Sequence, residues 1–393
     1  MRPSIAVLAC LLAFPAVRLD AQRINLPVKM SELQARARQD SLDPMAHYYV
    51  ALGYWNEKKW DDVERELREA IALQPRQADA WLALAFLPFG KNGHLWDDIY
   101  QKPMKPDVQK DYEAFEAASR RAYLIDPLVS QVIIGATMPK KSAFWDWDPE
   151  YYDTWYQAWD DINSGNYTRA YFNFSQMIKL YQDNLSRDEQ QLPAGWVWGR
   201  GMSAAHLGKT PEAVRDLTNL MSREMKERKV DTTDMLPFES NDYRYLIADV
   251  WQHGDSVDQA MALYKQVVAT DAGYYMAYVK MADIYEADRA YPEAIAMRKH
   301  AVDANPDDPS LVMDLGVTQG KAGAFQAAAE SLEEAIQGNP RDVRAYFWLA
   351  IALQQLGKNA EARGAYQHFV DVAPSRYDRQ IAMARQRLAA LPQ

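Results

Sequence analysis

The chain has 393 residues, of which 48% are hydrophobic and 25% charged, and its formal net charge is −10. This acidic balance argues against nucleic acid and anionic membrane surfaces as partners. Cys10 is the only cysteine, so the chain cannot form an internal disulfide, a cysteine-based metal site or a second thiol nucleophile. A chain of this length can bury a core that is large enough to be stable without such bonds.

Residues 1–21 have the features of an export signal. Arg2 supplies a positive end, Ile5–Val17 is an apolar run, and Ala21 is a small residue at the expected cleavage point. The run is too short to span a bilayer. We therefore expect an exported chain that is periplasmic or extracellular after cleavage. An uncleaved anchor stays an alternative; lipid attachment at Cys10 is disfavoured because the apolar run continues past it.

Residues 22–130 are predicted to form an N-terminal array of helical repeats, preceded by a short helix at Ser31–Ser41. The first repeat covers 44–77, and the second begins at Ala78. An insertion at 87–110 interrupts the second repeat, and its prolines and glycines predict a loop. Such insertions lie on one face of a repeat protein and often bind a partner, but this one can equally cover apolar surface.

The next boundaries follow from changes in the sequence pattern. Residues 131–150 are irregular and rich in aromatic residues, which is typical of a joint. Residues 151–227 contain two further repeats, and 228–240 reads as a polar linker. Residues 241–376 form a long regular array, and 377–393 are predicted to form a helix that caps it. Later than the signal, no stretch is long and apolar enough to span a bilayer.

Four segments of 34 residues follow one another without a gap between 241 and 376. Position 8 of each segment is small and position 20 is alanine, so two helices can approach closely. Glycine at position 15 tolerates a left-handed end of the first helix, and proline at position 32 ends the second. These residues are Ala248, Ala282, Gly316 and Ala350 at position 8, Ala260, Ala294, Ala328 and Ala362 at position 20, Gly323 and Gly357 at position 15, and Pro306, Pro340 and Pro374 at position 32.

This pattern closely resembles the tetratricopeptide repeat family. The resemblance implies an all-α, right-handed solenoid of stacked helix-turn-helix units, about eight in this chain. One helix pair cannot bury its own apolar face, so stability comes from stacking. The resemblance also implies a concave groove, lined by the first helix of each repeat, that holds a protein or peptide. Chaperone-binding members clamp a terminal carboxylate with Lys at position 5 and Asn at position 9; neither residue is present here, which argues against an acidic C-terminal tail as the partner.

The resemblance places positions 5 and 9 of each first helix in the concave groove and position 4, which includes Trp81 and Tyr278, in the packed core. Apolar residues recur at positions 5 and 9, and an exposed apolar face of this extent indicates an interaction site. Tight winding of the solenoid, or filling by 87–110 or 128–150, is the alternative. The candidate partner-binding residues are Tyr48, Phe86, Trp155, Trp159, Trp198, Tyr245, Met313 and Phe347.

The sequence contains no recognisable catalytic or metal-binding motif. None of its six histidines stands in a metal-binding spacing, and His47, at position 4 of the first repeat, is interpreted as a histidine at the edge of the core. We therefore expect no catalytic residue, no cofactor and no metal. The favoured function is a non-enzymatic exported scaffold or adaptor for a protein or peptide. The alternative is a carbohydrate-binding or glycan-processing accessory protein of the cell envelope, with Trp155, Trp159 and Trp198 stacking on sugar rings.

Overall fold

The structure is a computed structural model that describes residues 24–99, 103–129, 149–185, 192–227 and 239–392. The predicted export signal, most of the predicted joint at 131–150 and most of the predicted linker at 228–240 lie outside these residues. Within the described ranges, all the regular elements are helices. None of the described helices is long and apolar enough to cross a membrane.

The N-terminal helices differ from the prediction at the insertion. They are α1 (Met30–Gln39), α2 (Pro44–Asn56), α3 (Trp60–Leu73), α4 (Ala78–Lys91), α5 (Leu95–Asp98) and α6 (Pro106–Ile125). The prediction of one loop over 87–110 is wrong, because α4 continues past Pro88 and α6 already begins at Pro106. Leu87, Phe89 and Leu95 are buried in the core of the second repeat, and their burial offsets the cost of a proline inside a helix. Proline in the first turn of α6 costs no hydrogen bond.

The rest of the chain continues as helix pairs. The middle helices are α8 (Pro149–Asn163), α9 (Tyr167–Leu185), α10 (Ala194–His206) and α11 (Thr210–Glu227). The long array consists of α12 (Ser240–His253), α13 (Val257–Thr270), α14 (Tyr275–Ala287), α15 (Tyr291–Ala304), α16 (Pro309–Lys321), α17 (Phe325–Gly338), α18 (Val343–Gln355) and α19 (Asn359–Val372). The short 3-10 helix η4 (Ser375–Tyr377) and α20 (Asp378–Ala390) follow.

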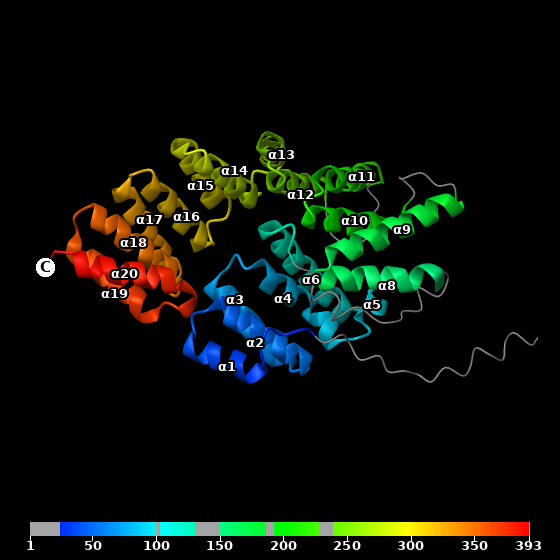
Figure 1. Cartoon of the computed structure of the whole chain (residues 1–393), viewed down its shortest axis with the longest axis horizontal. Coiled ribbons are helices and arrows are strands. Elements are labelled where there is room, and N and C mark those ends of the chain that lie inside the picture. The colour runs from blue at the N-terminus through cyan, green and yellow to red at the C-terminus, as the bar shows by residue number, and fades with distance from the viewer. Residues whose placement is uncertain (1–23, 100–102, 130–148, 186–191, 228–238, 393) are drawn as a thin grey trace, which may run out of the picture.

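Each helix packs mainly against its neighbours in sequence, so the chain is a solenoid of stacked helix pairs. This confirms the predicted all-α solenoid. The solenoid curls round until α1, α2 and α3 lie beside the C-terminal helices (Figure 1). The first repeat and the last repeats are therefore neighbours in space although they are distant in sequence.

The positions that were predicted to bring two helices together do so. All four alanines at position 20 and the three alanines at position 8 are fully buried. At Gly316, the glycine at position 8, an added Cβ would lie 2.7 Å from the Cγ atom of Leu332 on the second helix. The close approach of the two helices therefore requires the smallest residue at this site.

A left-handed residue ends the first helix of most repeats. The predicted glycines Gly323 and Gly357 have φ angles of 81° and 75°, as expected for a left-handed cap. Position 15 of five other repeats also has a positive φ. These residues are Gly165, Gly208, Lys58, Asp255 and Arg289.

The described C-terminal helix covers the open end of the array. Ile381 and Ala384 of α20 are buried in the same cluster as Phe369 of α19. Arg387 of α20 also donates a hydrogen bond of 3.0 Å to the side-chain oxygen of Gln354 in α18. This packing agrees with a capping role, because the end of a solenoid needs a cover for its apolar face.

Candidate functional site

The eight side chains predicted to line an open groove are all buried, and none is more than 9% exposed. Several pack against the second helix of their own pair: ring centroids lie 5.1 Å apart for Phe347 and Phe369, and 5.5 Å apart for Trp159 and Phe174. Tyr245 also packs against Tyr274 at the start of the next pair, with ring centroids 5.1 Å apart. Position 5 is therefore buried in all eight repeats, whereas position 9 is buried in some repeats and partly or fully exposed in others. The expectation that these residues form an exposed stripe is wrong; their contact with a partner stays a prediction.

Position 4, which was predicted to be core, is less buried. Trp81 and Tyr278 are both only partly buried. The ring nitrogen of Trp81 donates a hydrogen bond of 2.8 Å to the carbonyl oxygen of Pro75, and Tyr278 lies 5.3 Å from the ring of His300. Position 4 thus lies at the rim of the helix pair where it carries a large ring, as at Trp81 and Tyr278, whereas the smaller Val197 and Val312 at this position are buried.

Positions 6 and 9 of three successive first helices, α14, α16 and α18, carry a row of accessible side chains. All six side chains are partly or fully exposed. Together they give a row with charged groups at one end and apolar groups at the other, here called the inner groove. Its residues are Lys280, Asp283, Asp314, Val317, Trp348 and Ile351.

A buried carboxylate forms an ion pair with Lys280 at the charged end of the inner groove. Asp249 of α12 is fully buried, 2.5 Å from the Lys280 ammonium and 3.3 Å from Nδ1 of His253. Burial alone would raise the pKa of Asp249, but the hydrogen bond from His253 and the charge of Lys280 lower it overall. The hydrogen bond with Asp249 raises the pKa of His253 to about 9. Lys280 is thereby fixed in position beside an ionised partner.

Segments from the N-terminal half cover the inner side of the array. Leu42, in the turn before α2, packs against the cluster that contains Met313 and Phe347. Leu124 of α6 packs against the cluster that contains Tyr245. Leu42 and Leu124 therefore support filling of the groove, and both lie outside the two segments named as possible fillers, 87–110 and 128–150. The described apolar residues of 87–110 pack in the cluster of the first two repeats.

The middle repeats have their own cluster. It contains Trp155, Trp159 and Trp198, and Leu128 packs against it. Leu128 is the first residue of the segment 128–150 that was considered as a filler; nearly all of that segment lies outside the described residues.

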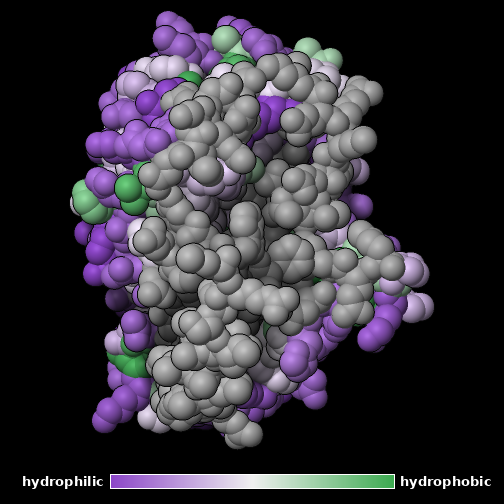
Figure 2. Space-filling view, turned by 90° about the vertical axis from the view of Figure 1, so that its right-hand side faces the viewer, coloured by the Kyte–Doolittle hydropathy of each residue, from purple (hydrophilic) through white to green (hydrophobic). Residues whose placement is uncertain are grey.

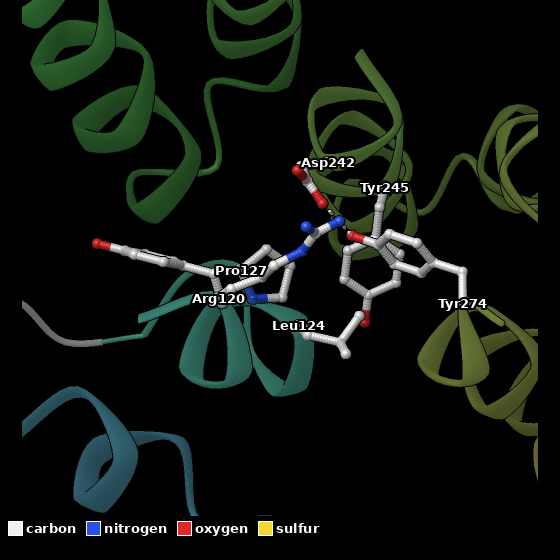
Figure 3. A pocket seen from close by; sticks show the side chains of 7 residues that line it. Arg120, Leu124, Pro127, Asp242, Tyr245 and Tyr274 are labelled. Atoms are coloured by element: carbon white, nitrogen blue, oxygen red, sulfur yellow. Dashed lines mark hydrogen bonds between the residues drawn. The ribbon is translucent and has the colours of Figure 1, made fainter. Parts of the chain in front are cut away.

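A small cavity marks the contact between α6 and the array (Figure 3). Its volume is about 10 Å³, which is the space of about one water molecule. Arg120 extends from α6 toward Asp242, whose carboxylate accepts a hydrogen bond of 2.9 Å from the Tyr274 hydroxyl. Burial raises the pKa of Asp242. The cavity has no room for a small-molecule ligand. We interpret it as a packing defect between α6 and the long array.

The turn after α3 supplies the contact that the sequence did not predict. The Nε atom of Arg76 donates a hydrogen bond of 2.8 Å to the Ser310 hydroxyl, and a terminal nitrogen lies 2.5 Å from a carboxylate oxygen of Asp314. Asp314 belongs to the inner groove, so Arg76 enters that groove. A polar residue in a turn between repeats is ordinary, and the single sequence therefore carried no signal for this role.

His47 links the two helices of the first repeat. Its Nδ1 atom lies 2.7 Å from the Glu66 carboxylate, and its Nε2 atom lies 3.1 Å from the carbonyl oxygen of Ser41. Both ring nitrogens face acceptor oxygen atoms, an arrangement that favours the charged form of the ring. Burial lowers its pKa, but these bonds raise it overall. In the described part of the chain, no group of acidic, histidine or cysteine side chains is placed to hold a metal ion.

The described surface shows no broad apolar patch on the side drawn in Figure 2, where hydrophilic residues predominate outside the grey atoms. The large hydrophobic side chains that are exposed within the described ranges lie on three helices: Phe172 and Leu180 on α9, Val257 on α13 and Met383 on α20. They are scattered, and single exposed hydrophobic residues are normal on a protein surface.

Comparison with known families identifies part of the repeat array. The tetratricopeptide repeat model matches residues 313–376, which are the last two predicted repeats, 309–342 and 343–376, without their first four residues. This region therefore has the fold of a protein-interaction scaffold. No curated protein matches the chain.

Solved structures resemble the chain at the level of the repeated helix pair. The C-terminal part of a tetratricopeptide repeat protein from Cytophaga hutchinsonii is 16% identical, with a TM-score of 0.45 over 56% of this chain and 82% of that chain. A repeat protein from Parabacteroides merdae is 13% identical, with a TM-score of 0.44 over 63% of this chain and 94% of that chain. A Rap protein in complex with competence and sporulation factor is 12% identical, with a TM-score of 0.35 over 92% and 97%.

Proposed function

We propose that the chain is an exported, non-enzymatic scaffold that binds a protein or peptide along the inner groove. The carrying observation is the row at positions 6 and 9 of α14, α16 and α18, which places charged and apolar side chains side by side at accessible sites. An extended or helical peptide needs both kinds of contact, since apolar contacts supply affinity and charges supply specificity. The fold supports this proposal because stacked repeats form long continuous surfaces.

Trp348 is the residue that tests the inner groove most clearly. It is partly exposed and belongs to the residue type most often found at binding hot spots. We expect Trp348→Ala to weaken partner capture by about 2 kcal/mol or more. The matched control is Phe172→Ala, since Phe172 is an exposed aromatic residue on α9, away from the inner groove. Equal loss of capture in both variants, or in neither, would reject the inner groove as the binding surface.

Export is proposed from the N-terminal sequence alone. Arg2 followed by the apolar run Ile5–Val17 predicts cleavage after Ala21. N-terminal sequencing of the chain purified from its own source should find Gln22 as the first residue. A chain that starts at Met1 would contradict cleavage, and one that starts at Cys10 would indicate a lipoprotein.

The carbohydrate alternative gains no support from the geometry. Trp155, Trp159 and Trp198 are buried in one apolar cluster of the middle repeats. A sugar ring would need an exposed aromatic face on which to stack. A glycan array probed with the exported chain should therefore show no specific binding, and a reproducible glycan signal would revive this alternative.

A further inference from the structure

The first repeat and the last repeats meet along a line of polar contacts, here called the seam. Every contact in it joins residues that are more than 230 positions apart in sequence. The Ser375 hydroxyl donates a hydrogen bond of 2.7 Å to Asp40, and Arg376 donates one of 3.1 Å to Asp43. On the C-terminal side, the seam uses the first turns of α16, the turn after α17 and the short helix η4 after α19.

The seam continues along α3. Arg341 forms a partly exposed ion pair with Glu69, and the side-chain amide of Asn339 donates a hydrogen bond of 3.1 Å to the carbonyl oxygen of Ala72. Leu42 adds an apolar contact near the same line.

Arg76 is an enclosed cation of the seam. Its side chain is only 16% exposed and lies between the Ser310 hydroxyl, the Ser310 carbonyl oxygen and the Asp314 carboxylate. Burial opposes the charge of Arg76, but Asp314 and Asp308 favour it and raise its pKa overall. A guanidinium with this set of acceptors is fixed by the directions of its hydrogen bonds as well as by charge attraction. Ser310 and Asp314 lie at positions 2 and 6 of α16, so Arg76 occupies the inner groove itself.

We propose that the first repeat is a releasable occupant of the inner groove, held closed by the Arg76 contact and the polar seam. Release would uncover Asp314 and Ser310 and would remove Leu42 from the cluster of Met313 and Phe347. A partner that replaces the first repeat must satisfy the same atoms, so it presents an arginine to Asp314 and an apolar side chain in place of Leu42. This identification of the partner's chemistry rests on the proposed function; the opening of the seam does not.

Pulsed electron paramagnetic resonance between two spin labels across the seam tests the opening directly. The labels are placed at Gln39→Cys in α1 and Gln380→Cys in α20, both exposed, in a chain whose sole native cysteine is changed by Cys10→Ser. We expect one narrow distance in the otherwise unchanged protein. Arg76→Met and Arg341→Glu should each add a population at longer distances, because one removes the enclosed charge and the other places a carboxylate against Glu69.

Three controls separate opening from damage. The combination Glu69→Arg with Arg341→Glu restores an ion pair of reversed sign and should restore the narrow distance. Arg68→Met should change nothing, because Arg68 pairs with Glu64 within α3. A second label pair, Gln326→Cys in α17 with Gln367→Cys in α19, should keep its distance in every variant.

The outcomes are distinct. A narrow distance across the seam in both Arg76→Met and Arg341→Glu overturns the proposal, and so does a long distance that charge reversal fails to correct. These measurements need no partner, so they stand apart from the capture test with Trp348→Ala. If the seam opens but no arginine-bearing partner is ever captured, the proposed function fails while the releasable closure stands.

Discussion

Two kinds of interface hold this chain together, and they differ in chemistry. Between successive repeats of the long array, side chains such as Phe347, Phe369 and Ile381 form one continuous buried cluster. Between the first repeat and the last repeats, the contacts are mainly charges and hydrogen bonds such as the Arg341–Glu69 pair. The repeats of the array are thus held together by apolar packing, whereas the contact between the two ends of the solenoid is mainly polar.

The energies of the two interfaces support this distinction. Burying apolar surface contributes roughly 25 cal/mol per Å², whereas an exposed ion pair contributes about 0–1 kcal/mol. Salt also screens exposed charges and leaves apolar contacts intact. Conditions or variants can therefore weaken the seam without unfolding the repeats, and the predictions below test this in order of the size of their expected effects.

The largest effect is expected from emptying a buried position 5. Phe347→Ala should cost about 3–5 kcal/mol of stability, as is usual for a buried aromatic residue. Its neighbour Tyr346 is only partly buried, so Tyr346→Ala should cost clearly less. Chemical denaturation of both variants gives the comparison. Equal losses would mean that positions 4 and 5 are buried alike, which would contradict the packing described above.

A smaller effect is expected from overfilling the contact within a helix pair. Ala328 at position 20 is fully buried, so Ala328→Leu should cost about 1–3 kcal/mol by forcing α16 and α17 apart. Ala360, which is exposed in α19, serves as the matched control and should tolerate leucine. A melting temperature that is unchanged in both variants would show that the helix pairs are loosely packed.

These two predictions also show which features of the fold could be predicted from the sequence. The period of 34 residues located the helix pairs, the buried alanines and the left-handed Gly323 correctly, because close packing and turn geometry depend on residues that are near one another in sequence. The exposed face was assigned wrongly, since a rotation of the first helix decides whether position 4 or position 5 is buried. The 34-residue period of the sequence does not determine how far the first helix is rotated about its axis.

The contacts of the seam could not be predicted from the sequence. Arg76 and Asp314 are 238 positions apart, and nothing local marks either residue. Their contact depends on how far the whole solenoid curls, which accumulates over all the helix pairs between them. The insertion was misjudged for another reason: Pro88 predicts a break in α4, but burial of Leu87 and Phe89 outweighs it.

A gain in stability is expected at the left-handed helix ends. Arg289 has a φ of 58°, a conformation that costs a residue with a side chain roughly 1–2 kcal/mol. Arg289→Gly should therefore stabilise the chain by about 1 kcal/mol after the greater backbone freedom of glycine is included. The reverse change Gly323→Arg should destabilise by a similar amount. Denaturation midpoints that move in the same direction for both variants would contradict the interpretation that Arg289 and Gly323 occupy the same left-handed position at the end of a first helix.

The smallest effect concerns pH at the edge of the inner groove. The folded pKa of His253 is about 9, above the ordinary 6.5. Its stabilising effect is thus complete below pH 6.5 and is lost as the pH rises through 9. The lowered pKa of Asp249 gives the opposite dependence, with stability lost in acid. The ring of His253 is more than half exposed, so screening keeps the effect small. The melting temperature of His253→Gln should fall less than that of the wild type over this rise in pH, and an identical fall would contradict the His253–Asp249 coupling.

The central claim is that the solenoid closes on itself through its first and last repeats. Asp40 and Ser375 test it most directly, because their side-chain oxygens lie 2.7 Å apart although 335 positions separate them. In a chain with Cys10→Ser, the pair Asp40→Cys and Ser375→Cys should react with a short bismaleimide to give an internally cross-linked monomer in high yield. Cross-linking that occurs only between molecules, or not at all, would show that the two ends of the solenoid do not meet.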